Sequence, residues 1–381
     1  MQSFLLIMQS NSQAASPLNP LILLPLAGAI LGIVLGLNSL SHLFPPIICG
    51  ISILGAIALL VRGAFRKRSP TSSIDYAKIA AINFAQYIPW LKENVRGHDA
   101  VIDSLGSILQ QTVSLAKPGR TLGAYLFVGP TGTGKTFLAH LIAQAVYPGS
   151  EPIMLRMNQY KHDSDVYTLI GPPPGMPGYE VGGSLTRPVL ENPYRVVIVD
   201  EIEKCHKDVQ HCFYDVLDAA TCREKSSGKL VDFSGTIFFG TCNAGVEELR
   251  KLRDQIPDMA TWSGKSRDVL SRAAGFDKAF LARWSGIYLM DELPPIHVAE
   301  IACLQLVKRW AEYGIELTYT SPEVILNAVE RNEEFKEYGV RQLRTFLQTK
   351  TDPSISVAKA QGISKVVLTL DEKGDIIIAQ A

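Results

Sequence analysis

One run of eight residues, 129–136, constrains this chain more than any other feature. Its letters, GPTGTGKT, fill every fixed position of the phosphate-binding pattern GxxxxGK[ST]. The run follows a short apolar strand expected at residues 125–128 and precedes a helix expected at about residues 135–146. Glycines let backbone N–H groups turn inward around phosphates, and the N-terminus of the following helix adds partial positive charge. The sequence therefore predicts a nucleotide-binding loop made of Gly129, Pro130, Thr131, Gly132, Thr133, Gly134, Lys135 and Thr136.

A second feature completes the expected ATP site. A buried strand is expected at residues 195–199, apolar from Val196 to Val199, and Asp200 and Glu201 follow it directly. Asp200, together with the Thr136 hydroxyl, is expected to hold Mg²⁺, while Lys135 reaches the β- and γ-phosphates. Glu201 is expected to act as the base that activates water, because a carboxylate beside the γ-phosphate can accept its proton. The sequence thus predicts an ATPase that uses ATP and Mg²⁺.

The order of strands and helices predicts the fold class. Further apolar strands are expected at residues 153–157 and 236–240, separated by helical segments, which favours a parallel sheet with helices on both faces. After residue 293, helical patterns cover residues 298–313, 321–331 and 340–349, and strands are expected at residues 366–370 and 375–379. We therefore expect an α/β domain of the P-loop class with a small, mostly helical C-terminal lid domain.

The first 61 residues contain no Asp, Glu, Lys or Arg. Two apolar stretches in this region, at about residues 18–37 and 45–63, are long enough for membrane helices. The basic cluster that follows, Arg66, Lys67 and Arg68, is typical of the cytoplasmic side. We expect a transmembrane helical hairpin that contacts membrane lipid. A cleaved signal peptide fits less well because no basic n-region is present, and a soluble buried hairpin would carry charges on its exposed face.

These patterns divide the chain into four expected parts. They are a membrane anchor (residues 1–68), a linker helix (69–90), a large ATPase subdomain (91–292) and a small C-terminal lid subdomain (293–381). The expected location is a bacterial inner membrane with the ATPase module in the cytoplasm, where ATP is present. The formal net charge is zero, so we expect no binding to nucleic acid. The six cysteines show no disulfide or zinc spacing.

A series of shorter motifs makes the stretch 95–287 resemble the second ATPase ring of ClpA/ClpB-type AAA+ unfoldases. The motifs are VRGHD (95–99), GPTG (129–132), GGSLT (182–186), DEIEKCH (200–206), VDF (231–233), TCNAG (241–245), FLAR (280–283) and YGVRQL (338–343). Val95, which opens the first motif, is assigned to the nucleotide-binding residues. The resemblance implies an ATP-driven motor that pulls on, unfolds or disassembles protein substrates.

The resemblance also implies roles for three further residues. Asn243 matches sensor 1, which orients the attacking water. Arg283 matches the arginine finger, which reaches the γ-phosphate bound to a neighbouring subunit, and Arg341 matches sensor 2 in the lid. Because a finger acts on the next subunit, the resemblance implies a homo-oligomeric ring, most simply a hexamer.

The chain departs from the family at the loop that grips substrate. Where the family has an aromatic residue, this chain has Met176 followed by Pro177, with Tyr179 close by. We assign Met176 and Tyr179 to the substrate pore loop, since methionine still offers flexible apolar contact. A Clp peptidase docking tripeptide is not evident; the corresponding region holds only QIPDM (255–259).

Three functions stay open at this level. The first is a membrane-anchored protein remodeller, favoured by the complete set of hydrolytic residues. The second is a nucleotide-dependent membrane scaffold, or a slow switch that needs an activator as torsin-type proteins do, favoured by the altered pore loop. The third, the unfolding half of a membrane protease, requires a separate peptidase because the chain contains no HExxH motif.

Overall fold

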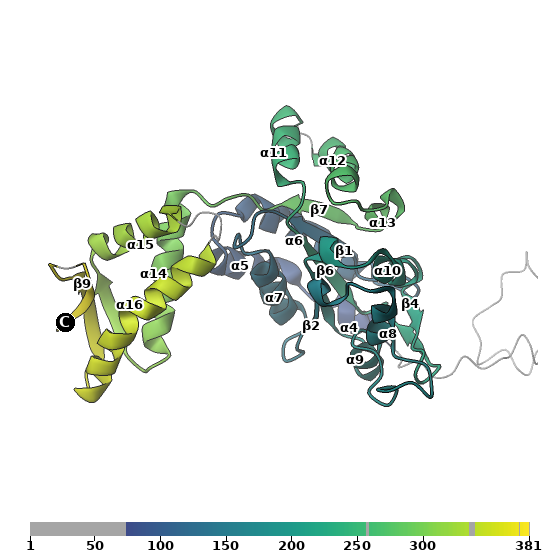
Figure 1. Cartoon of the computed structure of the whole chain (residues 1–381), viewed down its shortest axis with the longest axis horizontal. Helices are drawn as coiled ribbons and strands as arrows, with labels where there is room; N and C mark the ends of the chain where they lie inside the picture. Colours follow the sequence, from purple (N-terminus) through teal and green to yellow (C-terminus); the bar gives the residue numbers. More distant parts are fainter. Residues whose placement is uncertain (1–73, 257–258, 335–339, 373, 381) are drawn as a thin grey trace, which may run out of the picture. The chain divides into compact units, whose positions relative to one another are not determined.

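The computed structural model describes residues 74–256, 259–334, 340–372 and 374–380 (Figure 1). The expected membrane hairpin, residues 1–68, lies outside these ranges, as do parts of the 255–259 and 338–343 motifs. Within the described ranges, no helix combines the length and the apolar character needed to cross a bilayer.

The main sheet has five parallel strands in the order β2-β3-β6-β1-β7. Their bounds are β1 Ala124–Val128, β2 Ile153–Arg156, β3 Val196–Asp200, β6 Ile237–Cys242 and β7 Gly286–Leu289. The predicted parallel sheet is confirmed, and β7 is an addition that the sequence reading did not contain. Strands β1, β3 and β6 are almost entirely buried, as expected for a sheet covered on both faces.

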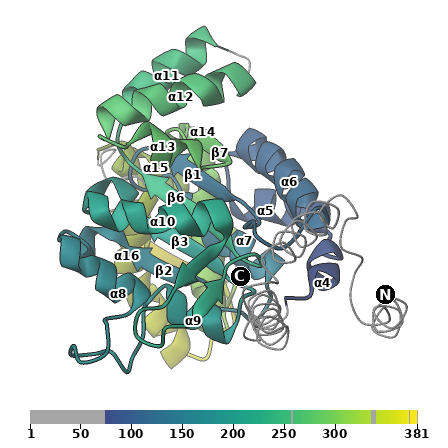
Figure 2. The same ribbon diagram turned by 90° about the vertical axis from the view of Figure 1, so that its right-hand side faces the viewer.

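Alternating side chains of each strand enter two separate hydrophobic clusters. Leu126 and Val128 of β1 belong to one cluster, whereas Tyr125 and Phe127 belong to the other. Figure 2 shows helices on both sides of the sheet. The Tyr125 side is covered by α4 Tyr76–Ala80, η1 Phe84–Tyr87, α5 Ile88–Asn94, α6 Asp99–Ser114 and α7 Lys135–Val146. The Leu126 side is covered by α8 Val166–Ile170, α9 Thr186–Glu191, α10 Lys207–Ala219, α11 Val246–Gln255, α12 Met259–Ala273 and α13 Lys278–Ala282.

The strand order places the carboxyl ends of β1, β6 and β3 side by side at one edge of the sheet. The loops that leave these ends begin at Gly129, Asn243 and Glu201, respectively. In parallel α/β sheets, this edge is where ligands bind. The topology alone therefore brings together three segments that are far apart in the sequence.

The segment before the sheet differs from the expected linker helix. Residues 74–94 form two short helices, α4 and α5, separated by the 3-10 turn η1. Asp75 caps α4 by accepting the N–H groups of Ala77 and Lys78. Ile79 and Phe84 are at most 1% exposed and pack with the helices on the Tyr125 side. Ile79 and Phe84 are five residues apart, which is about 140° around the axis of a straight α-helix. A single straight helix would therefore not bury both side chains on one face.

The C-terminal region forms a second, smaller cluster around a three-stranded sheet of order β10-β9-β8. Its elements are α14 Pro295–Ala311, β8 Glu316–Thr320, α15 Pro322–Glu334, α16 Val340–Ala360, β9 Lys365–Leu370 and β10 Ile376–Gln380. Strand β8 pairs parallel to β9, and β9 pairs antiparallel to β10. The remaining short elements are the hairpin strands β4 Thr221–Arg223 and β5 Leu230–Asp232 and the turns η2 Met157–Gln159, η3 Asp163–Asp165 and η4 Ile202–Lys204.

Candidate functional site

The loop 129–136 connects β1 to α7 and adopts a cradle that only glycines allow. Gly132 and Gly134 have φ values of +82° and +93°, in the left-handed region that other residues rarely occupy. A Cβ on Gly129 would lie 2.0 Å from the Met290 carbonyl oxygen. The loop therefore holds its backbone N–H groups at the start of an α-helix, the arrangement that binds phosphate.

Lys135 is buried at the base of this loop. Its side chain is 6% exposed, and its Nζ donates hydrogen bonds to the carbonyl oxygens of Gly129 (2.7 Å) and Pro130 (2.6 Å). Burial lowers the pKa of the Lys135 ammonium to about 8, opposed by the nearby Cys242, Glu203, Asp200 and Glu201. A buried ammonium held only by neutral carbonyls has unused capacity for an anion, which is what a nucleotide phosphate would supply.

A carboxylate and a hydroxyl meet beside the lysine. The Thr136 hydroxyl donates a hydrogen bond to Asp200 Oδ1 at 2.9 Å. These two oxygen ligands, one from the start of α7 and one from the end of β3, are the kind that Mg²⁺ prefers. The donor set fits Mg²⁺ bound together with phosphate oxygens, so Thr136 and Asp200 would hold the ion.

Glu201 follows Asp200 and lines the same cavity. Its carboxylate accepts a hydrogen bond from Asn158 Nδ2 at 3.3 Å and forms an ion pair with Lys204 Nζ at 3.0 Å. Asn158 was not found by sequence reasoning. It follows β2, which is adjacent to β3 only in the folded sheet, and a polar residue after a strand end was the sole signal available.

Two residues at the end of β6 join this group. The Thr241 hydroxyl donates to Asp200 Oδ1 at 2.7 Å, and the Glu201 N–H donates to Thr241 Oγ1 at 2.9 Å. Asn243, the expected sensor, lines the cavity, and its backbone N–H donates to Glu203 Oε1 at 3.0 Å. The sequence reading quoted Thr241 within a motif but gave it no role.

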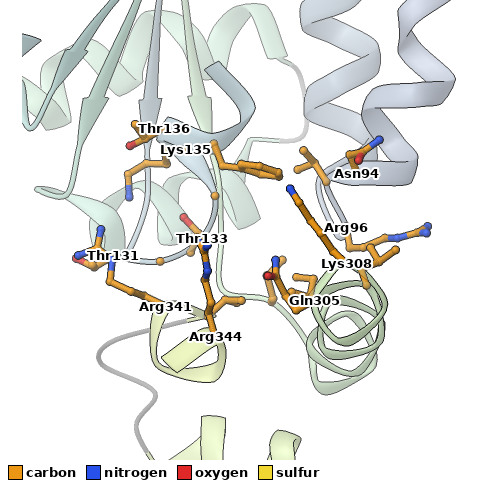
Figure 3. A pocket seen from close by; sticks show the side chains of 18 of the residues that line it. Asn94, Arg96, Thr131, Thr133, Lys135, Thr136, Gln305, Lys308, Arg341 and Arg344 are labelled. Atoms are coloured by element: carbon orange, nitrogen blue, oxygen red, sulfur yellow. The ribbon is translucent and has the colours of Figure 1, made fainter. Parts of the chain in front are cut away.

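Residues 131–136, together with Asp200, Glu201, Thr241 and Asn243, line one cavity of about 590 Å³, a size that suits a nucleotide. Val95 lies in its wall and is 4% exposed. The lid region contributes Gln305, Lys308, Arg341 and Arg344, and Figure 3 shows the two arginines beside the phosphate-loop residues. The structure therefore brings Val95, loop residues 131–136, Asp200, Glu201, Asn243 and Arg341 together around one cavity, whereas Gly129 and Pro130 do not line it and instead accept hydrogen bonds from Lys135.

Arg283 is placed elsewhere. It does not line the cavity; it caps α13 and contacts α10 instead. Its Nε and Nη2 atoms donate to Asp218 Oδ2 at 2.9 Å and 2.5 Å, and its guanidinium lies 4.2 Å from the centre of the Tyr214 ring. A position away from the chain's own site is what a residue acting on a neighbouring subunit requires.

The expected pore loop is an exposed surface segment. Residues 175–181 connect α8 to α9, with Met176 45% exposed and Tyr179 41% exposed. Val181, which sequence reasoning did not single out, is 76% exposed. Three apolar side chains on one exposed loop offer a surface that a polypeptide could contact.

Comparison with known proteins agrees with this geometry. Residues 120–286 match the family model described as "AAA domain (Cdc48 subfamily)". This match supports an AAA+ ATPase domain in that region, and the similar proteins are of the Clp type. The chain is 34% identical over 285 residues to the negative regulator of genetic competence ClpC/MecB of Bacillus subtilis, covering 71% of this chain and 34% of that protein.

Two further relatives show the same relation. The chaperone protein ClpB of Oceanobacillus iheyensis is 32% identical over 308 residues, covering 76% of this chain and 37% of the relative. The ATP-dependent Clp protease ATP-binding subunit ClpE of Streptococcus pneumoniae is 33% identical over 302 residues, covering 76% and 39%. The chain thus spans little more than a third of the length of these relatives. The predictions that the chain is an ATPase and uses ATP with Mg²⁺ are confirmed.

Proposed function

We propose that this chain is an ATP-driven motor that remodels or unfolds protein substrates as a homo-oligomeric ring, most simply a hexamer. The observation that carries the proposal is the meeting of Lys135, Thr136, Asp200 and Glu201 in one cavity at the carboxyl edge of the sheet. The similarity to Clp-type relatives, which include a protein named as a chaperone, supports a protein substrate.

Each residue of the site has a chemical task in this proposal. The Lys135 ammonium and the loop N–H groups neutralise phosphate charge, and Mg²⁺ held by Thr136 and Asp200 would draw electron density from the phosphate oxygens. Glu201 accepts the proton of the attacking water. Asn243 lines the same cavity and would orient that water, and Arg341 reaches the cavity from the lid.

The test of the hydrolytic assignment is the Glu201→Gln variant, in which an amide replaces the proposed base. We expect ATP to bind with little change while steady-state hydrolysis falls by about 10²- to 10⁴-fold, the usual contribution of a general base. Glu248→Gln, an exposed position on α11, is the matched control and should hydrolyse ATP like the wild type. Normal turnover by the Glu201→Gln variant would remove Glu201 from the mechanism.

For substrate contact, the exposed loop 175–181 is the proposed gripping surface. Replacing Met176 and Tyr179 with alanine should leave ATP hydrolysis intact and abolish work on the protein substrate. The alternative is a nucleotide-dependent scaffold or activator-dependent switch with slow hydrolysis. The stiffening effect of Pro177 on the loop favours that alternative, which predicts that the alanine variants behave like the wild type.

We also propose that residues 1–68 anchor the motor in a membrane, with the ATPase module on the side where ATP is available, most simply a bacterial inner membrane. The support is the absence of charge over 61 residues followed by a basic cluster. The chain lacking residues 1–68 should move from the membrane fraction to the soluble fraction after cell lysis. Retention of the shortened chain in carbonate-washed membranes would reject this anchor.

A further inference from the structure

The backbone of Glu201 adopts an unusual conformation. Its φ and ψ angles are 55° and 50°, in the left-handed region. Among the residues that the structure describes, Ala220 is the only other non-glycine residue with positive φ. A non-glycine backbone in this region is strained and persists only when its surroundings enforce it. A contact with the backbone of Glu201, the proposed catalytic base, must therefore hold this conformation.

Two groups contact the backbone of Glu201: the Lys204 N–H donates to its carbonyl oxygen at 2.9 Å, and the Thr241 hydroxyl contacts its N–H. Thr241 is 1% exposed, and its Oγ1 accepts the Glu201 N–H at 2.9 Å. The same hydroxyl donates its proton to Asp200 Oδ1 at 2.7 Å. The directions of both bonds are fixed, because an amide N–H only donates and a carboxylate only accepts. One hydroxyl therefore links the turn at Glu201 to the carboxylate of Asp200.

The strand that carries Thr241 holds it in a fixed position. Thr241 belongs to β6, where it pairs in register with Phe127 of β1, and the preceding residue, Gly240, pairs with Val199 of β3. A β-branched residue in a buried strand has a restricted χ1 angle, so the hydroxyl has a fixed position. Asn158 and Lys204 contact the Glu201 carboxylate, but neither contacts its backbone N–H. Thr241 is therefore the side chain that fixes the direction of the Glu201 N–H.

We propose that Thr241 is a positioning residue for ATP hydrolysis. Its hydroxyl holds the Glu201 peptide in the left-handed turn, and this turn directs the Glu201 carboxylate into the cavity. The inference rests on the proposed role of Glu201 as the base. Thr241 makes two hydrogen bonds. The bond to Asp200 affects the metal ligand, whereas the bond from the Glu201 N–H affects the base. We assign the catalytic effect to the Glu201 contact because Asp200 keeps its second donor, Thr136, when Thr241 is changed.

The decisive variant is Thr241→Val, which has nearly the same shape and lacks both hydrogen bonds. Thr241→Ser, which keeps the hydroxyl, is the matched control. ATP hydrolysis by the full-length detergent-solubilised chain is measured over a range of Mg²⁺ concentrations up to and beyond saturation of the wild type, together with the affinity for a non-hydrolysed ATP analogue. We expect kcat of the valine variant to fall by at least about tenfold, a part of the general-base contribution. The KM and the analogue affinity should stay within about threefold, and the serine variant should recover most of kcat.

A double variant links the effect to Glu201. If Thr241 acts through the base, adding Thr241→Val to Glu201→Gln should cause no further loss of kcat, because residues that act as a unit are not additive. Thr241→Ala provides a second hydroxyl-free variant if the valine variant does not fold, as judged by its thermal unfolding midpoint.

Several results would overturn the inference. They are an unchanged kcat in the valine and alanine variants, recovery of the valine variant by excess Mg²⁺, and equal losses in the serine and valine variants. An additive loss in the Glu201→Gln background would do the same. Absence of hydrolysis in the wild type would instead count against the proposed function, so the two failures are distinguishable.

Discussion

The buried imidazole of His98 forms a hydrogen bond with the phosphate loop. His98 is 5% exposed, and its Nε2 lies 2.9 Å from the Thr133 carbonyl oxygen, so this nitrogen carries the proton of the neutral ring. Burial lowers the pKa of His98 below its usual value of 6.5, and the nearby His297 acts in the same direction. The motif VRGHD thus includes a side chain that fixes the loop, a role that the sequence did not reveal.

This lowered pKa predicts an acid-dependent loss of stability. Below pH 6.5 the unfolded chain binds a proton at His98 while the folded chain does not, so stability falls as the pH falls toward the folded pKa. The contribution of this one group cannot exceed about 1.4 kcal/mol per pH unit. The His98→Gln variant keeps an amide donor without titrating. Urea unfolding at pH 7.5 and 5.5 should show a larger acid loss in the wild type than in this variant, and equal losses would contradict the prediction.

The site residues that could be predicted are those that lie next to one another in the sequence. The loop from Gly129 to Thr136 and the pair Asp200 and Glu201 are local patterns, and each carries its chemistry in consecutive residues. Asn158, Thr241 and His98 act through contacts that the sheet and the helix packing create. Their positions depend on strand order, which no single sequence pattern specifies.

At the scale of elements, Gly240 in strand β6 tests how tightly the core is packed. A Cβ on Gly240 would lie 2.5 Å from the Trp284 ring and 2.8 Å from a Leu126 methyl group. Trp284 is 1% exposed, so its ring is packed on nearly every side. We expect Gly240→Ala to destabilise the chain by about 1–3 kcal/mol through overpacking.

Gly264 is the matched control for Gly240, because the same change to alanine should have the opposite effect on stability. It lies within α12, and a Cβ there would meet no atom within 4 Å. Gly264→Ala should stabilise the chain by about 0.5–1 kcal/mol, because alanine loses less backbone entropy in a helix. Urea unfolding of the nucleotide-free chain, followed by tryptophan fluorescence, should show midpoint shifts of opposite sign. A neutral Gly240→Ala variant would mean that Trp284 moves aside.

Three elements of the fold, β7, β8 and α16, differ from what the sequence predicts, and each difference has a physical reason. Strand β8 is partly exposed along its whole length and lies at a sheet edge, so it lacks the apolar alternation of a half-buried strand. Strand β7 is only four residues long. Helix α16 was expected to end at residue 349, yet it continues past Pro353 to Ala360. Burial of Ile355 and Ala358 in the lid cluster offsets the hydrogen bond that proline removes.

At the scale of the whole molecule, the central question is whether the ATP sites are shared between subunits. Within the described residues of one chain, Arg283 contacts Asp218 and Tyr214 rather than the cavity that holds Lys135. If Arg283 acts as a finger, its target is the γ-phosphate bound to a neighbouring subunit. A complete site then requires Glu201 from one subunit and Arg283 from the next.

This arrangement predicts that two inactive variants restore each other. Arg283→Ala should lower hydrolysis by about 10³-fold or more, the usual contribution of an arginine finger, with little change in ATP binding. In equal mixtures with Glu201→Gln, about one quarter of the interfaces in a ring would join an intact Glu201 to an intact Arg283. Hydrolysis should therefore reappear on mixing. Each variant alone, at the same total protein concentration, is the control and should stay inactive. An active Arg283→Ala variant alone, or mixtures that stay inactive although subunits exchange, would show that each chain completes its own site.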